Sequence, residues 1–171
     1  MIIPIWMADW EHQCCGPEIN PGDRAEWPIY FHCKESPTPT DEAPRFAVIS
    51  DMDVEAVWRW ESRETNVDGI TTVANWAHLH VGVFVHMDAD PGDTVVKYRG
   101  RVWHELHNSE PPPAVVGTVR AIYWHPAIIQ QVGPHEQRID GYQPGVAIGS
   151  TSTVPMGEMG AFRFALDVEG L

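Results

Sequence analysis

The stretch VEAVWRWESRETNVDGITTVANWAHLHVGV, residues 54–83, decides the predicted fold. At its centre lies Asp68-Gly69, a dipeptide typical of a type I′ turn, because both central residues of that turn need a positive φ and glycine adopts one freely. A tight turn there places Val67 opposite Ile70. The pairs that follow on one face are all apolar: Val54–Val83, Ala56–Val81, Trp58–Leu79 and Trp60–Ala77. Because a one-residue shift would mix apolar and polar side chains on both faces, we predict a β-hairpin over residues 54–83 with this face in the core.

The opposite face of this hairpin is more polar and carries two histidines. Its pairs are Val57–His80, Arg59–His78, Glu61–Trp76 and Thr65–Thr72. We define the His/Trp face as the five residues Arg59, Glu61, Trp76, His78 and His80. It is the candidate ligand-binding surface, with Trp76 as an apolar platform, and an ordinary solvated sheet face is the alternative. A helix that starts near Asp53 is a second alternative, since Glu55 and Arg59 have i, i+4 spacing.

Short segments rich in Val, Ile, Trp and Tyr continue along the chain between clusters of Gly and Pro. They predict further strands over residues 2–6, 25–33, 45–49, 96–107, 115–124 and 162–169. In the second of these the odd positions from Ala25 to Cys33 form an apolar face, and Gly100 is the expected site of a β-bulge. No long segment has the 3.6-residue period of an amphipathic helix.

These patterns predict one all-β domain over residues 1–171. We expect a small antiparallel barrel or sandwich, partly open and similar to SH3 or OB folds. The 14 Gly and 15 Pro concentrate in long loops, which we expect at 36–44, 108–113 and 133–160.

The charge of the chain is strongly negative, because 24 Asp and Glu outnumber 11 Lys and Arg and give a net charge of −13. Nucleic acid and anionic membrane surfaces are bound through clustered cations, so we expect neither as a partner. No apolar run exceeds four residues, whereas a membrane-spanning helix needs about twenty. The start of the chain lacks a secretory signal pattern and the three cysteines form no disulfide framework, so we expect a cytoplasmic protein.

Cysteines and histidines gather near the N-terminus at His12, Cys14, Cys15, His32 and Cys33. Their spacing matches no standard zinc finger, and adjacent strand residues such as His32 and Cys33 point to opposite faces. The run Cys14-Cys15-Gly16-Pro17 is typical of a turn. We expect buried or idle thiols here, with a structural zinc site as the alternative.

The remaining histidines offer weaker signals for catalysis. His78 and His80 share one strand face at about 6.6 Å, the spacing of metal-binding His-x-His pairs, but the glutamate and glycine of a cupin-like site are missing. His104 lies among apolar positions and is predicted to be a core histidine bonded to backbone. No standard catalytic motif is present. A nucleophile at Cys14 or Cys15 with His12 stays possible, although no third group orients it.

The N-terminal residues resemble those of a known family. The pattern is Ala8-Asp9-Trp10-Glu11, then Cys14-Cys15-Gly16, then Gly22-Asp23-x-x-x-Trp27, with weaker similarity at His78-x-His80-x-Gly82 and at Gly117-Thr118-Val119-Arg120-x-Ile122. It is similar to the pattern of an actinobacterial family of small proteins of unknown function. The resemblance implies a cytoplasmic context and brings no known activity, substrate or catalytic residue.

We therefore expect a non-enzymatic binding or interaction module whose partner is a protein or a small molecule, with no cofactor and no bound metal. The alternative is a metal-binding protein or a metal-dependent enzyme that uses His78 and His80. A third interpretation is a homodimer that forms through a patch of some of the eight tryptophans.

The negative charge leads to a prediction for solubility. Protonation of all nine histidines moves the formal net charge from −13 to −4, so self-repulsion weakens and solubility should fall below about pH 6.5, the ordinary histidine pKa. Turbidity measured along a pH series checks this expectation. Unchanged solubility down to about pH 5 would contradict it.

Overall fold

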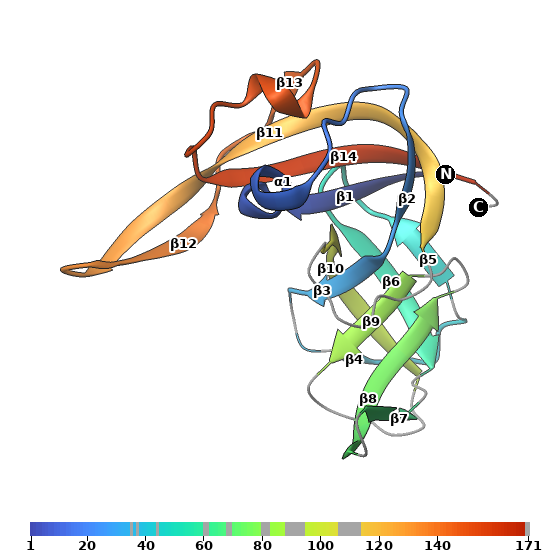
Figure 1. Cartoon of the computed structure of the whole chain (residues 1–171). Helices are drawn as coiled ribbons and strands as arrows, with labels where there is room; N and C mark the ends of the chain where they lie inside the picture. The colour runs from blue at the N-terminus through green and yellow to red at the C-terminus, as the bar shows by residue number, and fades with distance from the viewer. Residues whose placement is uncertain are drawn as a thin grey trace.

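The computed structural model (Figure 1) describes residues 1–34, 36, 38–43, 45–59, 62–67, 70–79, 83–87, 95–105 and 114–169. For residues 33, 58–59, 62–67, 70–79 and 83–87 it describes the backbone alone. Strands dominate this part of the chain, beside one helix, α1 (Asp9–Cys15), and a 3-10 turn at Thr151–Thr153. Among the described residues, no helix combines the length and apolar character needed to cross a bilayer. The expected all-β class is confirmed.

The strands that the structure describes form a single fourteen-stranded sheet. They are β1 (Ile2–Ala8), β2 (Arg24–Trp27), β3 (Ile29–Cys33), β4 (Thr38–Pro39), β5 (Arg45–Val48), β6 (Val54–Arg59), β7 (Ser62–Val67), β8 (Ile70–Leu79), β9 (Val83–Met87), β10 (Val95–His104), β11 (Val115–Gly133), β12 (Glu136–Tyr142), β13 (Val146–Ile148) and β14 (Gly160–Val168).

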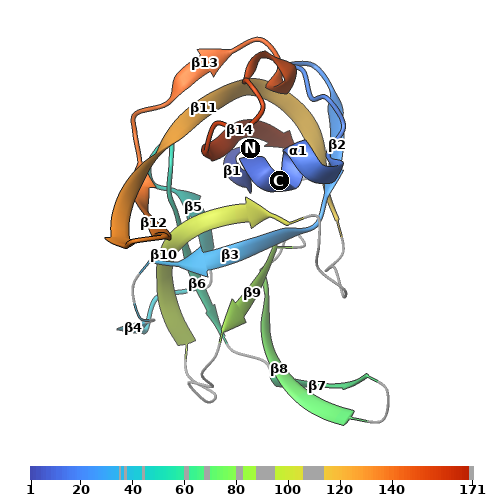
Figure 2. The same ribbon diagram turned by 60° about the vertical axis from the view of Figure 1, so that its left-hand side comes forward.

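The path through the sheet runs β12-β11-β14-β1-β10-β3-β9-β8-β7, and its two end strands do not pair with each other. The sheet curves strongly but stays open (Figures 1 and 2). The predicted barrel is therefore wrong. The expectation of purely antiparallel pairing is also wrong, because β1 runs parallel to β10 and β3 runs parallel to β9.

The tip of the predicted hairpin is confirmed. In β7 and β8, Val67 lies opposite Ile70 and Thr65 opposite Thr72, and this register continues to the pair of Ser62 with Asn75. The turn residues 68–69 lie outside the described residues. Local turn chemistry and strand patterning were thus sufficient to predict the pairing next to the turn.

Farther from the turn the pairs predicted for residues 54–59 are wrong, whereas those predicted for Trp60 and Glu61 lie outside the described residues. β6 is a strand rather than a helix, but it lies between β5 and β10, where Ala56 is opposite both Phe46 and Tyr98. The second half of β8 pairs instead with β9, so that Leu79 is opposite Val83. The apolar face of β6 is buried against Phe46 of the preceding strand and Tyr98 of the distant β10, and the turn at 68–69 encodes neither pairing.

Alternation along the central strands builds the core. β1 contributes Ile3, Ile5 and Met7, and β14 contributes Phe162 and Phe164. The predicted segment 25–33 is two strands, because after β2 pairs with β11 the chain crosses at Pro28 and β3 pairs with β10. The odd positions from 25 to 31 still belong to one core: Ala25, Ile29 and Phe31 are buried and Trp27 packs against it.

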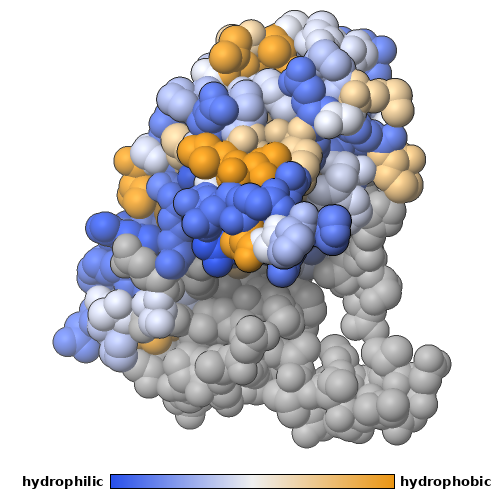
Figure 3. Space-filling model, turned by 90° about the vertical axis from the view of Figure 1, so that its left-hand side faces the viewer, coloured by the Kyte–Doolittle hydropathy of each residue, from blue (hydrophilic) through white to orange (hydrophobic). Residues whose placement is uncertain are grey.

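The expected loops at 36–44 and 133–160 contain regular structure. The short strand β4 lies in the first, whereas the predicted loop 108–113 lies outside the described residues. In the second, β12 pairs with the end of the nineteen-residue β11, and together they form a hairpin arm that projects from the body (Figure 1). The exposed aliphatic residues of this arm are Ile128, Ile129, Val132 and Ile139. Figure 3, viewed from the side toward which the arm projects, shows apolar patches within a hydrophilic surface.

Gly100 marks a close approach of strands rather than a bulge. The register of β10 on β6 runs through it without a shift, from Lys97 opposite Val57 to Gly100 opposite Val54. A Cβ at this position would collide with the carbonyl oxygen of His32 and would lie 2.8 Å from the ring of Phe31. Only glycine leaves room for the neighbouring backbone.

We predict that Gly100→Ala lowers the free energy of unfolding by about 1–3 kcal/mol, the usual cost of an overpacked site. Urea unfolding followed by tryptophan fluorescence measures this loss. Gly149→Ala is the matched control, because nothing lies within 4 Å of a Cβ built there, and it should change stability by less than about 0.5 kcal/mol. Equal effects of the two substitutions would contradict the close approach.

Candidate functional site

A cleft with a volume of about 330 Å³ opens where the end of α1 meets the junction of β2 and β3 and the end of β10. We call it the α1 cleft. Its apolar wall includes Met7 and Ile19, both buried. Three aromatic rings and two carboxylates also line the cleft: His12, Trp27, His104, Glu26 and Glu105.

The chain positions the α1 side of the cleft through a glycine. α1 ends at Cys15, and the N–H of Gly16 donates to the carbonyl oxygen of His12 at 2.9 Å. A Cβ at position 16 would lie 2.5 Å from Nδ1 of His12. The missing side chain therefore lets the backbone pass directly over the imidazole.

The opposite side of the cleft is a stacked pair of rings. Trp27 lies over His104 with ring centroids 5.2 Å apart and planes inclined by 14°, and Trp27 also packs edge-on against Phe164. Nδ1 of His104 lies 2.9 Å from the carbonyl oxygen of Pro28. A carbonyl only accepts, so Nδ1 carries the hydrogen and Nε2 is left as an acceptor. The prediction of a buried His104 bonded to backbone is confirmed.

Burial keeps the two imidazoles of the cleft neutral. Desolvation lowers the pKa of His104, against the smaller opposing effects of the Pro28 hydrogen bond and of Glu105. Desolvation alone lowers the pKa of His12, whose Nδ1 is buried without a hydrogen-bond partner among the described residues. The cleft thus presents neutral hydrogen-bonding rings.

Carboxylates supply the charge of the cleft. Glu26 is exposed, and Glu105 is partly buried and accepts a 2.8 Å hydrogen bond from Nε2 of His32. Burial and the nearby Glu105 charge raise the pKa of Tyr30 to about 12, so that phenol stays neutral. The Asp, Glu, Lys and Arg side chains among the described residues that line the cleft are therefore acidic alone.

The described side chains of the N-terminal cysteines and histidines do not converge on one point. Cys14 and Cys15 lie at the end of a helix, not in the predicted turn, and both thiols are exposed. His12 packs beneath Gly16 and His32 binds Glu105. Within the described ranges, no group of three or more His, Cys, Asp or Glu side chains is arranged to hold a metal ion.

The predicted His/Trp face is only partly described. Arg59 lies opposite Val95 on β10 rather than opposite His78, because β6 does not pair with β8. Trp76 and His78 remain two residues apart on β8 and lie opposite His86 and Phe84 of β9. Glu61 and His80 lie outside the described residues. The face therefore stays a prediction; its Arg59–His78 pair is wrong and its Glu61–Trp76 pair lies outside the described residues.

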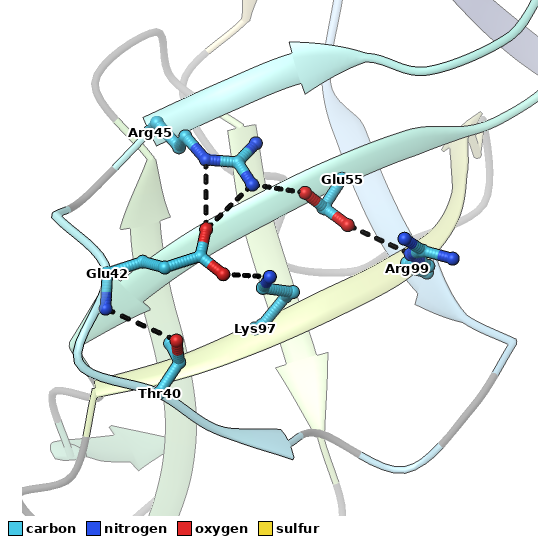
Figure 4. A network of polar contacts seen from close by, with 6 residues as sticks. All are labelled: Thr40, Glu42, Arg45, Glu55, Lys97 and Arg99. Carbon is cyan, nitrogen blue, oxygen red and sulfur yellow. Dashed lines mark hydrogen bonds and ion pairs between the residues drawn. The ribbon is translucent and has the colours of Figure 1, made fainter.

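A second hollow of about 260 Å³ lies beside β4 and β10 and contains Lys97 and Arg99. Figure 4 shows how carboxylates engage these cations. Glu42 pairs with Lys97, Nε of Arg99 lies 2.8 Å from the buried Glu55, and Arg45 bridges the two glutamates. The Arg99 hydrogen bond is the main reason that the pKa of Glu55 is lowered. Carboxylates of the protein itself thus engage these cations, so the α1 cleft is the better candidate site.

Sequence reasoning did not bring the cleft residues together. The sequence predicts Trp27 only as part of an apolar face and His104 as a core residue, offers His12 only within the alternative of a zinc site, and does not single out the two glutamates. The N-terminal motif was the available signal, because Gly16 and Trp27 belong to it and both line the cleft.

The neutral imidazoles predict a loss of stability in acid. Unfolded histidines bind protons below about pH 6.5, whereas burial lowers the pKa of folded His12 and His104. The unfolded chain then binds more protons, so the free energy of unfolding falls as the pH drops below that value. Urea unfolding at about pH 7.5 and 5 measures the difference.

His104→Asn removes the titrating group and keeps a donor for the Pro28 carbonyl, so it should lose less stability between the two pH values than the unsubstituted protein. His135→Asn, at the exposed turn of the hairpin arm, is the control and should lose as much. An identical pH response of all three proteins would show that His104 is not responsible.

Comparisons with known proteins place the chain in a family. No curated protein and no solved structure matches it. The model of a protein family of unknown function matches residues 1–156, and this range includes all the described residues that line the α1 cleft. The chain therefore belongs to DUF6578, a family of unknown function.

Proposed function

We propose that this protein is a non-enzymatic binding module whose α1 cleft takes a small neutral or cationic organic ligand with a flat apolar ring. The observation that carries the proposal is the Trp27–His104 stack, which lines the cleft with one imidazole nitrogen held as an acceptor. Such a pair offers an aromatic surface and one directional hydrogen bond, which is the usual chemistry of small-molecule sites.

The size and lining of the cleft support a small ligand. Its volume of about 330 Å³ lies near the lower end of the range of roughly 300–1,000 Å³ for ligand pockets. Met7 and Ile19 supply apolar contacts, and polar groups are few. Among the described residues that line it there is no hydroxyl, thiol or amine, so a covalent intermediate on Ser, Thr, Cys or Lys has no nucleophile there.

Charge supports a neutral or cationic ligand rather than an anion. Glu26 and Glu105 line the cleft, which holds no Lys or Arg among its described residues. The whole chain also carries a net charge of −13. A phosphate or carboxylate ligand would meet repulsion without a compensating cation.

Two further expectations remain proposals with separate support. The His/Trp face is a second candidate surface for a protein partner, since Trp76 and His78 lie two residues apart on the strand β8 and such positions share one face of a sheet. A cytoplasmic location is supported by the exposed free thiols of Cys14 and Cys15, because reducing compartments preserve such thiols.

Tryptamine is a suitable probe, since it joins a flat indole to an ammonium group. We predict saturable shifts of the amide resonances of His12, Gly16 and Trp27 when tryptamine is titrated into the ¹⁵N-labelled protein. Indole-3-propionate, which carries a carboxylate instead, should bind more weakly by about threefold or more, as expected when partly exposed charges interact. Shifts that map elsewhere, or equal affinity for the two probes, would contradict the proposal.

The contribution of the carboxylate is tested by substitution. Glu26→Gln should weaken tryptamine binding about threefold and leave indole binding unchanged. Glu136→Gln makes the same change of charge on the hairpin arm, where the side chain is exposed and far from the residues of the cleft in the fold. It should leave both affinities unchanged, and a loss equal to that of Glu26→Gln would point to net charge alone.

A further inference from the structure

Two adjacent thiols stand at the end of α1. Sγ of Cys14 and Sγ of Cys15 are 2.8 Å apart, and both residues are exposed. Adjacent side chains on a helix normally diverge, since successive residues point about 100° apart. This contact therefore places two accessible thiols close enough to react with each other.

The thiol pair adjoins the α1 cleft directly. Cys15 is followed by Gly16, whose N–H closes the last turn of α1 on the carbonyl oxygen of His12. Gly16 and His12 both line the cleft, and the ring of His12 packs edge-on against Phe162 of β14. A change in backbone geometry at residues 14–15 therefore displaces His12 and Gly16 on the α1 side of the cleft.

We propose that Cys14 and Cys15 form a reversible dithiol–disulfide site, oxidised by low-molecular-weight disulfides, and that its closure reshapes the α1 cleft. The effect on ligand binding rests on the proposed function, whereas the chemistry of the thiol pair does not.

The exchange proceeds in two balanced steps. The thiolate of Cys14 attacks a small disulfide, forms a mixed disulfide and expels one small thiolate. Cys15 then loses its proton and attacks Sγ of Cys14, which forms the Cys14–Cys15 bond and expels the second small thiol. The protein gives up two electrons and two protons, and the small disulfide takes up both. The hydrogen bond with Cys14 raises the pKa of Cys15, which fits its role as the second thiol to react.

Geometry makes this disulfide a switch rather than a permanent crosslink. Neighbouring Cα atoms across a trans peptide are about 3.8 Å apart, which is shorter than the roughly 4.4–6.8 Å found in ordinary disulfides. Closure therefore strains the backbone, and strained disulfides are the easily reduced ones. The strain falls on the last turn of α1, where the Gly16–His12 hydrogen bond is made.

The test equilibrates the full chain with mixtures of reduced and oxidised glutathione, blocks the remaining thiols and identifies the products by peptide mass spectrometry. In excess oxidised glutathione the peptide with Cys14 and Cys15 should lose two hydrogen atoms and carry no glutathione, and excess reduced glutathione should restore both thiols. Cys14→Ser and Cys15→Ser should instead retain one glutathione. Cys33→Ser should behave as the unsubstituted protein does.

Three outcomes would overturn the site: stable glutathione on the Cys14–Cys15 peptide of the unsubstituted protein, a disulfide between this peptide and Cys33, or Cys14 and Cys15 thiols that stay reduced. The coupling is read separately from amide spectra of the Cys33→Ser protein. Oxidation should shift the resonances of His12 and Gly16, leave that of Gly149 in place and change the tryptamine affinity at least threefold. Closure without shifts at His12 and Gly16 would refute the coupling, whereas closure with those shifts in a protein that never binds tryptamine would refute only the proposed function.

Discussion

The pairing of β1 is the constraint on which the rest of the structure depends. All seven residues of β1 pair with β14, and Trp6 also lies opposite Trp103 on β10. A strand held on both sides cannot slip by one residue without turning its core side chains outward. Met7 is therefore fixed beneath the α1 cleft, while Trp6 packs on the other face under the guanidinium of Arg101, whose Cζ is 4.2 Å from the ring centroid. Both the cleft wall and the starting point of α1 follow from this arrangement.

The strands were largely predictable from the sequence, and their partners were not. Period-two alternation depends only on neighbours in the chain, so it identified β1, β10 and β14, and the turn at 68–69 set the β7–β8 register. The partner of β6 depends instead on which apolar surface lies nearest in the folded chain. β6 joins β10, about forty residues away along the sequence. The open sheet also depends on long-range pairing, since its end strands β12 and β7 lie in separate hairpins, with β11 and β8.

The cleft was harder to predict because its residues are individually ordinary. Trp27 and His104 each fit an apolar strand pattern, and nothing in the sequence relates positions 27 and 104. Their meeting depends on the crossing of the chain at Pro28, where it leaves β11 for β10. That crossing also places the Pro28 carbonyl beside His104, which fixes the tautomer of the ring. The residue that breaks the predicted strand is thus the one that orients the site.

The wall of the cleft formed by α1 is the part most open to change. A seven-residue helix is too short to be stable by itself, so α1 depends on the strand that precedes it and on contacts such as His12 with Phe162. The Trp27–His104 side has no such dependence, because both rings stand on paired strands. A strain applied at Cys14 and Cys15 is therefore absorbed by the helical wall and not by the stacked rings. The cleft can change shape while its aromatic surface stays in place.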